Sequence, residues 1–221
     1  RDAWVYGFSS EQVASRGQSM ISFYNEQIVE LGDRCAEAEN LVDRDPTKIK
    51  WTSSLFQKAR RGELLSEDET EVVVSVYRPF GKARLFTERA LIHRPGKQFS
   101  FFPTPDRDNL GFYLNGVHAT SEFAVLMVDE IPCLDLFGKG GHFFPRYNYA
   151  EQGSAENLLD ASEDDGSLYR RMDNITDEIL TDYQAAYDNP VTKDDIFFYV
   201  YGLLHSPDYQ DRFQVDLIKM L

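Results

Sequence analysis

The central third of the sequence, from Val76 to Tyr149, most limits what the chain can fold into. Apolar and polar residues alternate along it, most of the Phe residues fall within it, and Gly, Pro and Asn interrupt it repeatedly. Such alternation with frequent breaks is typical of short strands joined by loops. Because the flanking segments show helical patterns, the sequence predicts an α+β fold in which helices precede and follow a small, loop-rich, mostly antiparallel β unit.

The composition along the chain indicates three parts. Residues 1–65 are predicted to be a helical segment, residues 66–150 a β-rich core, and residues 151–221 an acidic loop followed by helices that pack on the core. Asn115-Gly116 is a hairpin signal within the core. Strands are expected at residues 71–76, 84–86, 99–102, 110–114, 123–129 and 134–137.

The N-terminal part carries two helical patterns. Apolar residues recur at three- and four-residue spacing from Ser10 to Asn40, which predicts an amphipathic helix. Asp45-Pro46 then interrupts the pattern, because the residue before Pro avoids helical geometry. A second, basic helical stretch is expected to end at Gly62, and its cations are Lys48, Lys50, Lys58, Arg60 and Arg61.

The C-terminal part begins with an expected surface loop from Glu151 to Ser167, which is rich in acids and shows little periodicity. Asn174–Asp177 can then cap one helix, and Thr192 begins a capping-box variant for the next. That second helix, Ile196–His205, is apolar nearly all round and is therefore expected to be buried. Ser206-Pro207 starts a last amphipathic helix.

Charge is distributed unevenly over a chain whose net charge is -14. Between Tyr77 and Lys97 six cations face one acid, a local charge of +5, whereas from Glu151 to Asp195 thirteen acids face three cations, a local charge of -10. The overall charge opposes nonspecific adhesion to nucleic acid. The polarity nevertheless predicts a basic patch that could face a polyanion.

Cysteine content and hydropathy favour a cytoplasmic protein. Two cysteines, Cys35 and Cys133, are too few for a disulfide framework and fit a reducing compartment. The closest approach to a membrane span, Ile196–Leu204, is about half the required length, so no membrane role is expected. The chain opens on Arg1-Asp-Ala-Trp4 without an initiator Met or leader pattern, so we expect it to be a piece of a longer polypeptide.

Common catalytic motifs do not fit the sequence. The glycines of Gly138–Gly141 lack Walker spacing, and Gly-x-Ser-x-Gly does not occur. Asn189-Pro190 is not followed by the Pro-aromatic pair that amino-group methylation uses. Asp129 and Glu130 could form a strand-end nuclease site, although no Lys follows at the usual short spacing. The histidines are scattered without a metal-binding companion: His93, His118, His142 and His205.

The remaining functional signal is the basic, aromatic-rich region between Tyr77 and Phe99. Arginine can contact guanine bidentately, and Lys and Arg also hold phosphates without sequence preference. A solvated cationic edge beside core aromatic residues is an equally good interpretation of the composition alone.

Three blocks taken together resemble the C-terminal specificity region of Type ISP restriction-modification enzymes and related helicase-methyltransferase polypeptides. They are Arg1-Asp-Ala-Trp-Val-Tyr6, Tyr77-Arg-Pro-Phe80 and the long block from Asp194 to Tyr209. Ile131-Pro-x-Leu-Asp-Leu136 and Phe144-Pro145 follow in the same order. The resemblance spans nearly the whole chain.

The resemblance implies that this chain is a target recognition domain, with an adenine-N6 methyltransferase and an ATP-dependent translocase and nuclease upstream in the same polypeptide. Double-stranded DNA is the implied partner. S-adenosylmethionine, ATP and Mg²⁺ are expected only in the upstream domains, and no catalytic or metal-binding residue is expected here. From charge and position we predict DNA contacts by Arg78, Lys82, Arg84, Arg94 and Lys97, with Lys58, Arg60 and Arg61 holding the DNA backbone.

Two other functional classes stay open. The chain could be a protein-interaction module that docks onto a motor or partner subunit through aromatic residues. A nuclease centred on Asp129 and Glu130 is the third hypothesis. The target sequence, and the residues that contact base edges, do not follow from the resemblance, because different members recognise different sequences.

Overall fold

The structure is a computed structural model that describes residues 4–66, 70–117, 122–138, 141–151, 168–187 and 189–219. It divides into two compact units. The N-terminal unit comprises Arg1–Tyr77 and Gly81–Pro95, and the C-terminal unit comprises Arg78–Phe80 and Gly96–Leu221. Helices at both ends and small antiparallel sheets between them confirm the α+β fold class. The division into three parts stays a prediction.

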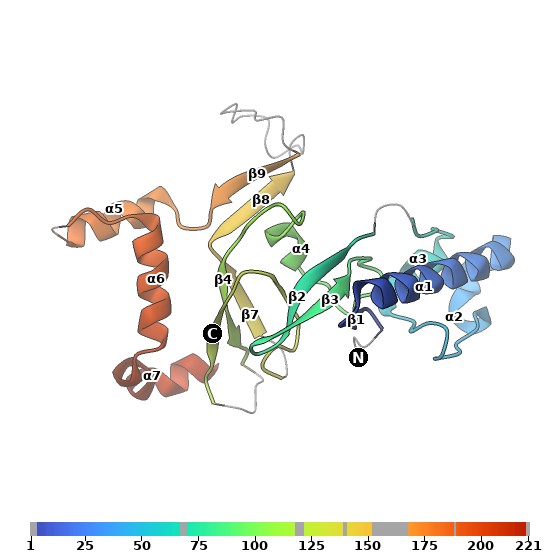
Figure 1. The fold of residues 1–221 in the computed structure, drawn as a ribbon, viewed down its shortest axis with the longest axis horizontal. Helices are drawn as coiled ribbons and strands as arrows, with labels where there is room; N and C mark the ends of the chain where they lie inside the picture. Colours follow the sequence, from blue (N-terminus) through green and yellow to red (C-terminus); the bar gives the residue numbers. More distant parts are fainter. Residues whose placement is uncertain are drawn as a thin grey trace. The chain divides into compact units, whose positions relative to one another are not determined.

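The N-terminal unit is built on α1 (Ser10–Leu31) (Figure 1). This helix begins where the predicted amphipathic helix begins but ends at Leu31 rather than near Asn40. The Ser9 hydroxyl caps this helix by accepting a hydrogen bond from the Gln12 N–H at 3.3 Å. Its buried residues share one face, and the helix ends at Gly32, whose φ of 51° favours glycine. The helical elements that follow are η1 (Gly32–Glu37), α2 (Ala38–Leu41) and α3 (Ser53–Arg60).

Strands β1 (Tyr6–Gly7), β3 (Gly81–Phe86) and β2 (Val72–Arg78) are neighbours in that order. Helix α1 approaches β3 closely at Gly17. A Cβ atom at this position would lie 2.6 Å from three ring atoms of the buried Phe86. Only glycine therefore allows the helix to meet the ring at this distance.

The C-terminal unit is centred on β4 (Gly111–Asn115), which pairs antiparallel with β5 (Val125–Val128) and with β7 (Gly141–Pro145). The register sets Leu114 opposite Val125. The hairpin expected near Asn115-Gly116 therefore forms, but through a longer connection than a two-residue turn.

Two glycines of this sheet lie beneath aromatic rings of the neighbouring strand. A Cβ atom on Gly111 would lie 2.3 Å from the ring of Phe143, and one on Gly141 would lie 2.2 Å from the hydroxyl oxygen of Tyr113. The rings thus lie across bare backbone and hold β4 and β7 together.

The core of this unit joins the sheet to two C-terminal helices. Side chains of Phe112, Leu114 and Val125 pack with Phe197, Leu204 and Leu217. The remaining elements of the unit are α4 (Gln98–Phe101), β6 (Ile131–Pro132), β8 (Tyr147–Glu151), β9 (Tyr169–Asp173), α5 (Asp177–Ala186), α6 (Lys193–Leu204) and α7 (Pro207–Lys219).

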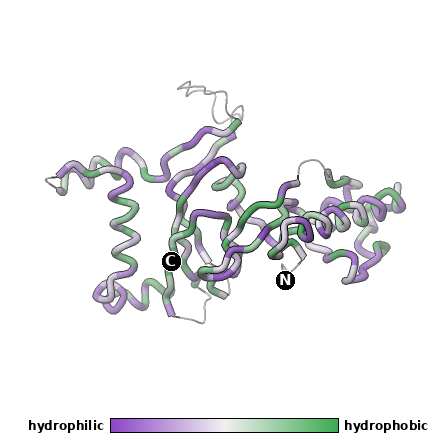
Figure 2. The backbone as a smooth tube through the Cα atoms, in the orientation of Figure 1, coloured by the Kyte–Doolittle hydropathy of each residue, from purple (hydrophilic) through white to green (hydrophobic). Residues whose placement is uncertain are grey.

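Helix α6 begins as the sequence predicts but is less buried than expected. The Thr192 hydroxyl accepts from the Asp195 N–H at 3.1 Å, and the Asp195 carboxylate accepts from the Thr192 N–H at 2.9 Å, which completes the capping box. Figure 2 shows green, hydrophobic stretches along α6 that alternate with paler ones. The side chains of Phe198 and Tyr199 are nevertheless about half exposed, because the core covers only the face that carries Ile196 and Phe197.

Two predicted strands are wrong. Phe99, Ser100 and Phe101 lie in the short helix α4, and Phe102 is its C-cap. The buried rings of Phe99 and Phe102 are three residues apart, which is the spacing of a helix rather than of a strand. Residues 134–137 form turns, and the Leu134 carbonyl accepts from the Tyr113 hydroxyl at 2.6 Å rather than from a strand partner. The pattern also missed the two-residue strands β1 and β6 and the longer strands β7, β8 and β9.

The basic helical stretch is shorter than expected. Thr52 is the N-cap of α3, and its hydroxyl accepts from the Leu55 N–H at 3.1 Å. Lys48 and Lys50 therefore lie before the helix, in the segment that joins Asp45-Pro46 to Thr52. The expected acidic loop lies almost wholly outside the described residues.

Candidate nucleic-acid interface

The turn between β2 and β3 presents an exposed aromatic ring at its tip. Pro79 fixes φ near -65° at the first turn position and donates no N–H, which suits a strand that leaves its ladder. Phe80 follows with a φ of 61°, at a position where such turns favour Gly or Asn. Its side chain is 92% exposed, although Phe is a residue type that folding usually buries.

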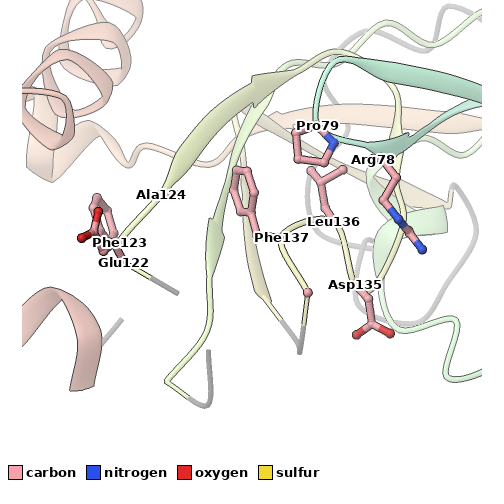
Figure 3. A pocket seen from close by; sticks show the side chains of 9 residues that line it. Arg78, Pro79, Glu122, Phe123, Ala124, Asp135, Leu136 and Phe137 are labelled. Carbon is pink, nitrogen blue, oxygen red and sulfur yellow. The ribbon is translucent and has the colours of Figure 1, made fainter. Parts of the chain in front are cut away.

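A hollow of about 800 Å³ lies beside this turn in the C-terminal unit (Figure 3). Glu122 and Phe123 lie at one end of it, and Arg78 and Asp135 lie toward the other. The Arg78 guanidinium contacts the sulfur of Cys133 at 3.4 Å. The hollow is lined by Arg78, Pro79, Glu122, Phe123, Ala124, Asp135, Leu136, Phe137 and Gly138.

Tyr113 positions the loop that forms one wall of the hollow. Its hydroxyl donates to the Leu134 carbonyl, and its ring meets that of Phe137 edge-on at 5.7 Å. Burial raises the pKa of the Tyr113 hydroxyl, which stays protonated and keeps donating at neutral pH. Strand β4 thus places a loop of mixed acidic and aromatic character next to the Arg78 turn.

Lys82 and Arg84 lie on one face of β3. Residues two apart on a strand point the same way, and the intervening Ala83 and the following Leu85 are buried. Lys82 is exposed and Arg84 is partly exposed. The strand pattern therefore directs both predicted contact residues away from the core.

Arg94 and Lys97 lie in the connection between β3 and α4. Both side chains are exposed, and Arg94 has a φ of 54°, which is uncommon for a residue other than glycine. The Lys97 carbonyl accepts from the N–H and the hydroxyl of Ser100, which fixes its backbone at the start of α4. Within the described residues, no carboxylate forms an ion pair with either side chain.

The three predicted backbone-holding cations at the end of α3 are already paired with acids. Lys58 and Arg61 contact the two carboxylate oxygens of Glu63 at 3.2 and 3.4 Å, and Arg60 pairs with Glu39. The hydrogen bond from Lys58 is the main cause that lowers the pKa of Glu63. Exposed pairs of this kind add little to stability, but they reduce the positive charge that a phosphate would meet.

The eight predicted residues are divided between the two units. Arg78 and Lys97 belong to the C-terminal unit, and the other six belong to the N-terminal unit. Lys58 and Arg61 are brought together by their shared acid, and Lys82 and Arg84 by their strand.

Sequence reasoning missed a second hollow, of about 990 Å³, in the C-terminal unit, whose lining combines four cations, four acids and two tyrosines. Its cations, Arg107, Arg170, Arg171 and Lys193, come from distant points of the chain. The local net charge around them is low or negative because acids lie nearby in the sequence, so counting charge along the chain did not detect them. Arg171 lies 4.4 Å from the ring centroid of Tyr147. The hollow is lined by Asp106, Arg107, Asp108, Tyr149, Tyr169, Arg170, Arg171, Met172, Asp173, Ile175, Thr176, Asp177 and Lys193.

Arg146, next to this second hollow, was also missed. Its side chain is 7% exposed and reaches carboxylate oxygens of Asp173 at 2.5 Å and Asp194 at 2.6 Å. Burial opposes ionisation of Asp173, but the hydrogen bond and charge of Arg146 and the charge of Lys193 outweigh it, so the pKa of Asp173 is lowered. Arg146 is the one cation in the aromatic segment from Phe143 to Tyr149. A lone cation among residues that tend to be buried could have indicated a buried ion pair.

Among the residues that the structure describes, no three His, Cys, Asp or Glu side chains are grouped to hold a metal ion. Within that same part of the chain, no helix combines the length and the apolar character needed to cross a membrane.

Residues 1–221 match the family model described as the Type ISP C-terminal specificity domain. The comparison with curated proteins gave no match. The chain is similar to part of a nuclease-deletion mutant of the Type ISP restriction-modification enzyme LlaGI in complex with a DNA substrate mimic, with 30% identity and a TM-score of 0.77 over 100% of this chain.

Two further solved structures are similar. One is a cryo-EM structure of a DrdV–DNA complex, with 30% identity and a TM-score of 0.79 over 99% of this chain. The other is the ATP-dependent Type ISP restriction-modification enzyme LlaBIII bound to DNA, with 27% identity and a TM-score of 0.78 over 100% of this chain. The chain spans 18%, 20% and 13% of the LlaGI, DrdV and LlaBIII chains, respectively.

Proposed function

This chain belongs to the family of Type ISP C-terminal specificity domains, and from that membership we propose that it recognises the DNA target of a single-polypeptide restriction-modification enzyme. The observation that carries the proposal is the family match over residues 1–221. It is supported by similar structures that hold DNA.

The proposed parent polypeptide carries an adenine-N6 methyltransferase and an ATP-dependent translocase and nuclease. The specificity domain itself is a non-catalytic region, so S-adenosylmethionine, ATP and Mg²⁺ belong to the upstream domains. Methylation of a base within a duplex requires that the base leave the stack. The recognition domain would hold the duplex in register while the methyltransferase extracts the adenine.

The geometry supports some predicted contacts more than others. Arg94 and Lys97 are exposed on a connection, and Lys82 and Arg84 point away from the core, as phosphate or base contacts must. We retain Arg78 because it lies beside the exposed turn and the first hollow. Lys58, Arg60 and Arg61 are weaker candidates, because DNA phosphates would have to replace Glu39 and Glu63 as their partners.

Methylation mapping followed by binding tests the proposal. The methylated sequence is identified in host DNA with and without the parent enzyme, and duplexes with and without that site are then titrated against the parent and against this chain alone. We expect the parent to prefer the mapped site by at least about 10³-fold over unrelated duplex. We expect weaker and less selective binding by the isolated chain, because its net charge is -14.

Either of two results would contradict the proposal. One is an equal affinity of the parent for the mapped and the scrambled duplex. The other is an unchanged methylated sequence after this chain has been replaced by the corresponding domain of a relative with another target. Tight, selective binding by the isolated chain would contradict only the expected dependence on the upstream domains.

A protein-interaction module is the second candidate function, and exposed aromatic side chains just after α5 and on α6 favour it. Tyr187, Phe198 and Tyr199 are each about half exposed. Tyr183 stacks on Tyr187 at 6.1 Å and meets Tyr199 edge-on at 6.3 Å, and a hydrogen bond with Tyr199 raises the pKa of Tyr187. Together these rings form an aromatic surface that the described core does not cover.

Paired variants separate the two functions. If the chain acts mainly in docking, Arg84→Glu with Arg94→Glu leaves DNA recognition intact, whereas Phe198→Ala with Tyr199→Ala disrupts assembly with the partner. If the chain recognises DNA, the arginine variant loses site preference. Binding titrations and size-exclusion chromatography of the same preparations provide the two measurements.

A further inference from the structure

Phe80 combines two local properties that the fold does not explain. Its backbone adopts a φ of 61°, which is sterically unfavourable for a residue with a bulky side chain. Its ring is 92% exposed, so it contributes little apolar burial in return. Glycine would adopt this φ without steric cost and would leave no apolar ring exposed to solvent. A ring held outward by an unfavourable backbone suggests that its partner lies outside this chain.

The residues around Phe80 suit a side chain that inserts between two neighbouring base pairs. Pro79 stiffens the turn immediately before the ring, so the ring projects from a rigid support. Arg78 and Lys82, both exposed, lie two residues before and after it. An apolar wedge flanked by cations is the arrangement with which proteins part stacked bases and hold the adjoining phosphates.

We propose that Phe80 is a wedge that inserts between two neighbouring base pairs at or beside the DNA target. This inference rests on the proposed function, since it requires that the chain bind duplex DNA. The ring replaces part of the base stacking that is lost at the opened step, and the stiff turn keeps the ring extended before binding. Phe80 thereby makes the duplex easier to deform at one defined position.

The test uses the full polypeptide and duplexes that carry the mapped target. A fluorescent base analogue, 2-aminopurine for adenine or pyrrolocytosine for cytosine, is placed at one position after another, and its emission reports loss of stacking. The variants are Phe80→Gly, which suits the positive φ, and Phe80→Trp, which keeps an aromatic wedge. Phe8→Ala is the matched control, because Phe8 is 89% exposed but lies outside this turn.

We expect the wild-type polypeptide to enhance emission at one step besides the methylated adenine. Phe80→Gly abolishes this enhancement and weakens specific binding by roughly 5- to 150-fold, the loss of one stacked base. Phe80→Trp and Phe8→Ala keep both properties. Thermal unfolding of Phe80→Gly at or above the wild-type temperature establishes that the variant is folded.

The outcomes separate this inference from the proposed function. If the wild-type polypeptide prefers the mapped site but no step depends on Phe80, the wedge is refuted and the proposed function stands. The same conclusion follows if Phe80→Gly weakens binding without changing emission at any step, because the ring would then act by docking. If the wild-type polypeptide shows no site preference, the proposed function itself fails.

Discussion

At the scale of single residues, two helical glycines have opposite surroundings. A Cβ atom on Gly17 of α1 would lie 2.6 Å from ring atoms of Phe86, whereas a Cβ atom on Gly202 of α6 would meet nothing within 4 Å. Glycine in a helix interior costs about 0.8–1.0 kcal/mol relative to alanine. The same replacement therefore has opposite consequences at the two sites.

We expect Gly17→Ala to lower the free energy of unfolding and Gly202→Ala to raise it. The clash at Gly17 costs about 1–3 kcal/mol, which exceeds the gain in helix propensity. Gly202→Ala gains up to about 1 kcal/mol without a clash. Urea unfolding of both variants, each compared with the wild type, measures the two changes. A stabilising Gly17→Ala variant would show that α1 does not press on Phe86 as described.

At the scale of elements, the sequence predicted what depends on local chemistry. The capping box of α6, the start of α1 and the core strands near 111–115 and 125–128 follow from nearby residues. Strands β7 to β9 escaped prediction because their pairing joins residues distant in sequence, as in Tyr147 opposite Asp173. Arg146 escaped for the same reason, since its partners lie 27 and 48 positions further along the chain.

The Arg146 ion pairs link the end of β9 to the first turn of α6 and should give stability a defined pH dependence. Because the pKa of Asp173 is lowered in the fold, this stabilisation is present at neutral pH. It is lost as the pH falls below about 4, the usual range of an aspartate. Asp173→Asn is expected to lose about 1 kcal/mol at neutral pH, a value discounted for the partial exposure of the carboxylate.

Chemical unfolding at several pH values between neutral and acidic tests this expectation. The wild type should lose its advantage over Asp173→Asn as the carboxylate is protonated. Asp182→Asn, an exposed change on α5, serves as the control and should follow the wild type. A constant difference between wild type and Asp173→Asn across the whole pH range would contradict the role given to the Arg146 contact.

At the scale of the whole molecule, a chain with a negative net charge can bind DNA only through a surface on which its cations outnumber its acids. Its net charge is -14, and some of its cations are already committed to acids. Sequence patterns located the basic region but could not distinguish paired from unpaired side chains, since Glu39 and Arg60 are 21 residues apart. The family resemblance gave the function, whereas residues that contact DNA stay a prediction from charge and position.

Salt dependence of DNA binding distinguishes the two groups of cations. In the full polypeptide, Arg94→Gln with Lys97→Gln should reduce the slope of log affinity against log salt by about 1.8, or about 0.9 for each phosphate that the variant no longer neutralises. Arg60→Gln with Arg61→Gln should change the slope less, because Glu39 and Glu63 already neutralise those side chains. Equal changes for the two pairs would overturn this ranking.

The glycines beneath the rings of Phe143 and Tyr113 have a consequence for how a new specificity could arise. No larger side chain fits at Gly111 or Gly141 without displacing a ring, so mutations there are expected to damage the scaffold. In the loops that leave the same strands, Tyr113 also holds Leu134 and Phe137, whereas the side chain of Glu122 is exposed. Evolution could therefore alter the recognised sequence by changing loop residues while the supporting sheet remains intact, and an engineer grafting loops between relatives would keep both glycines.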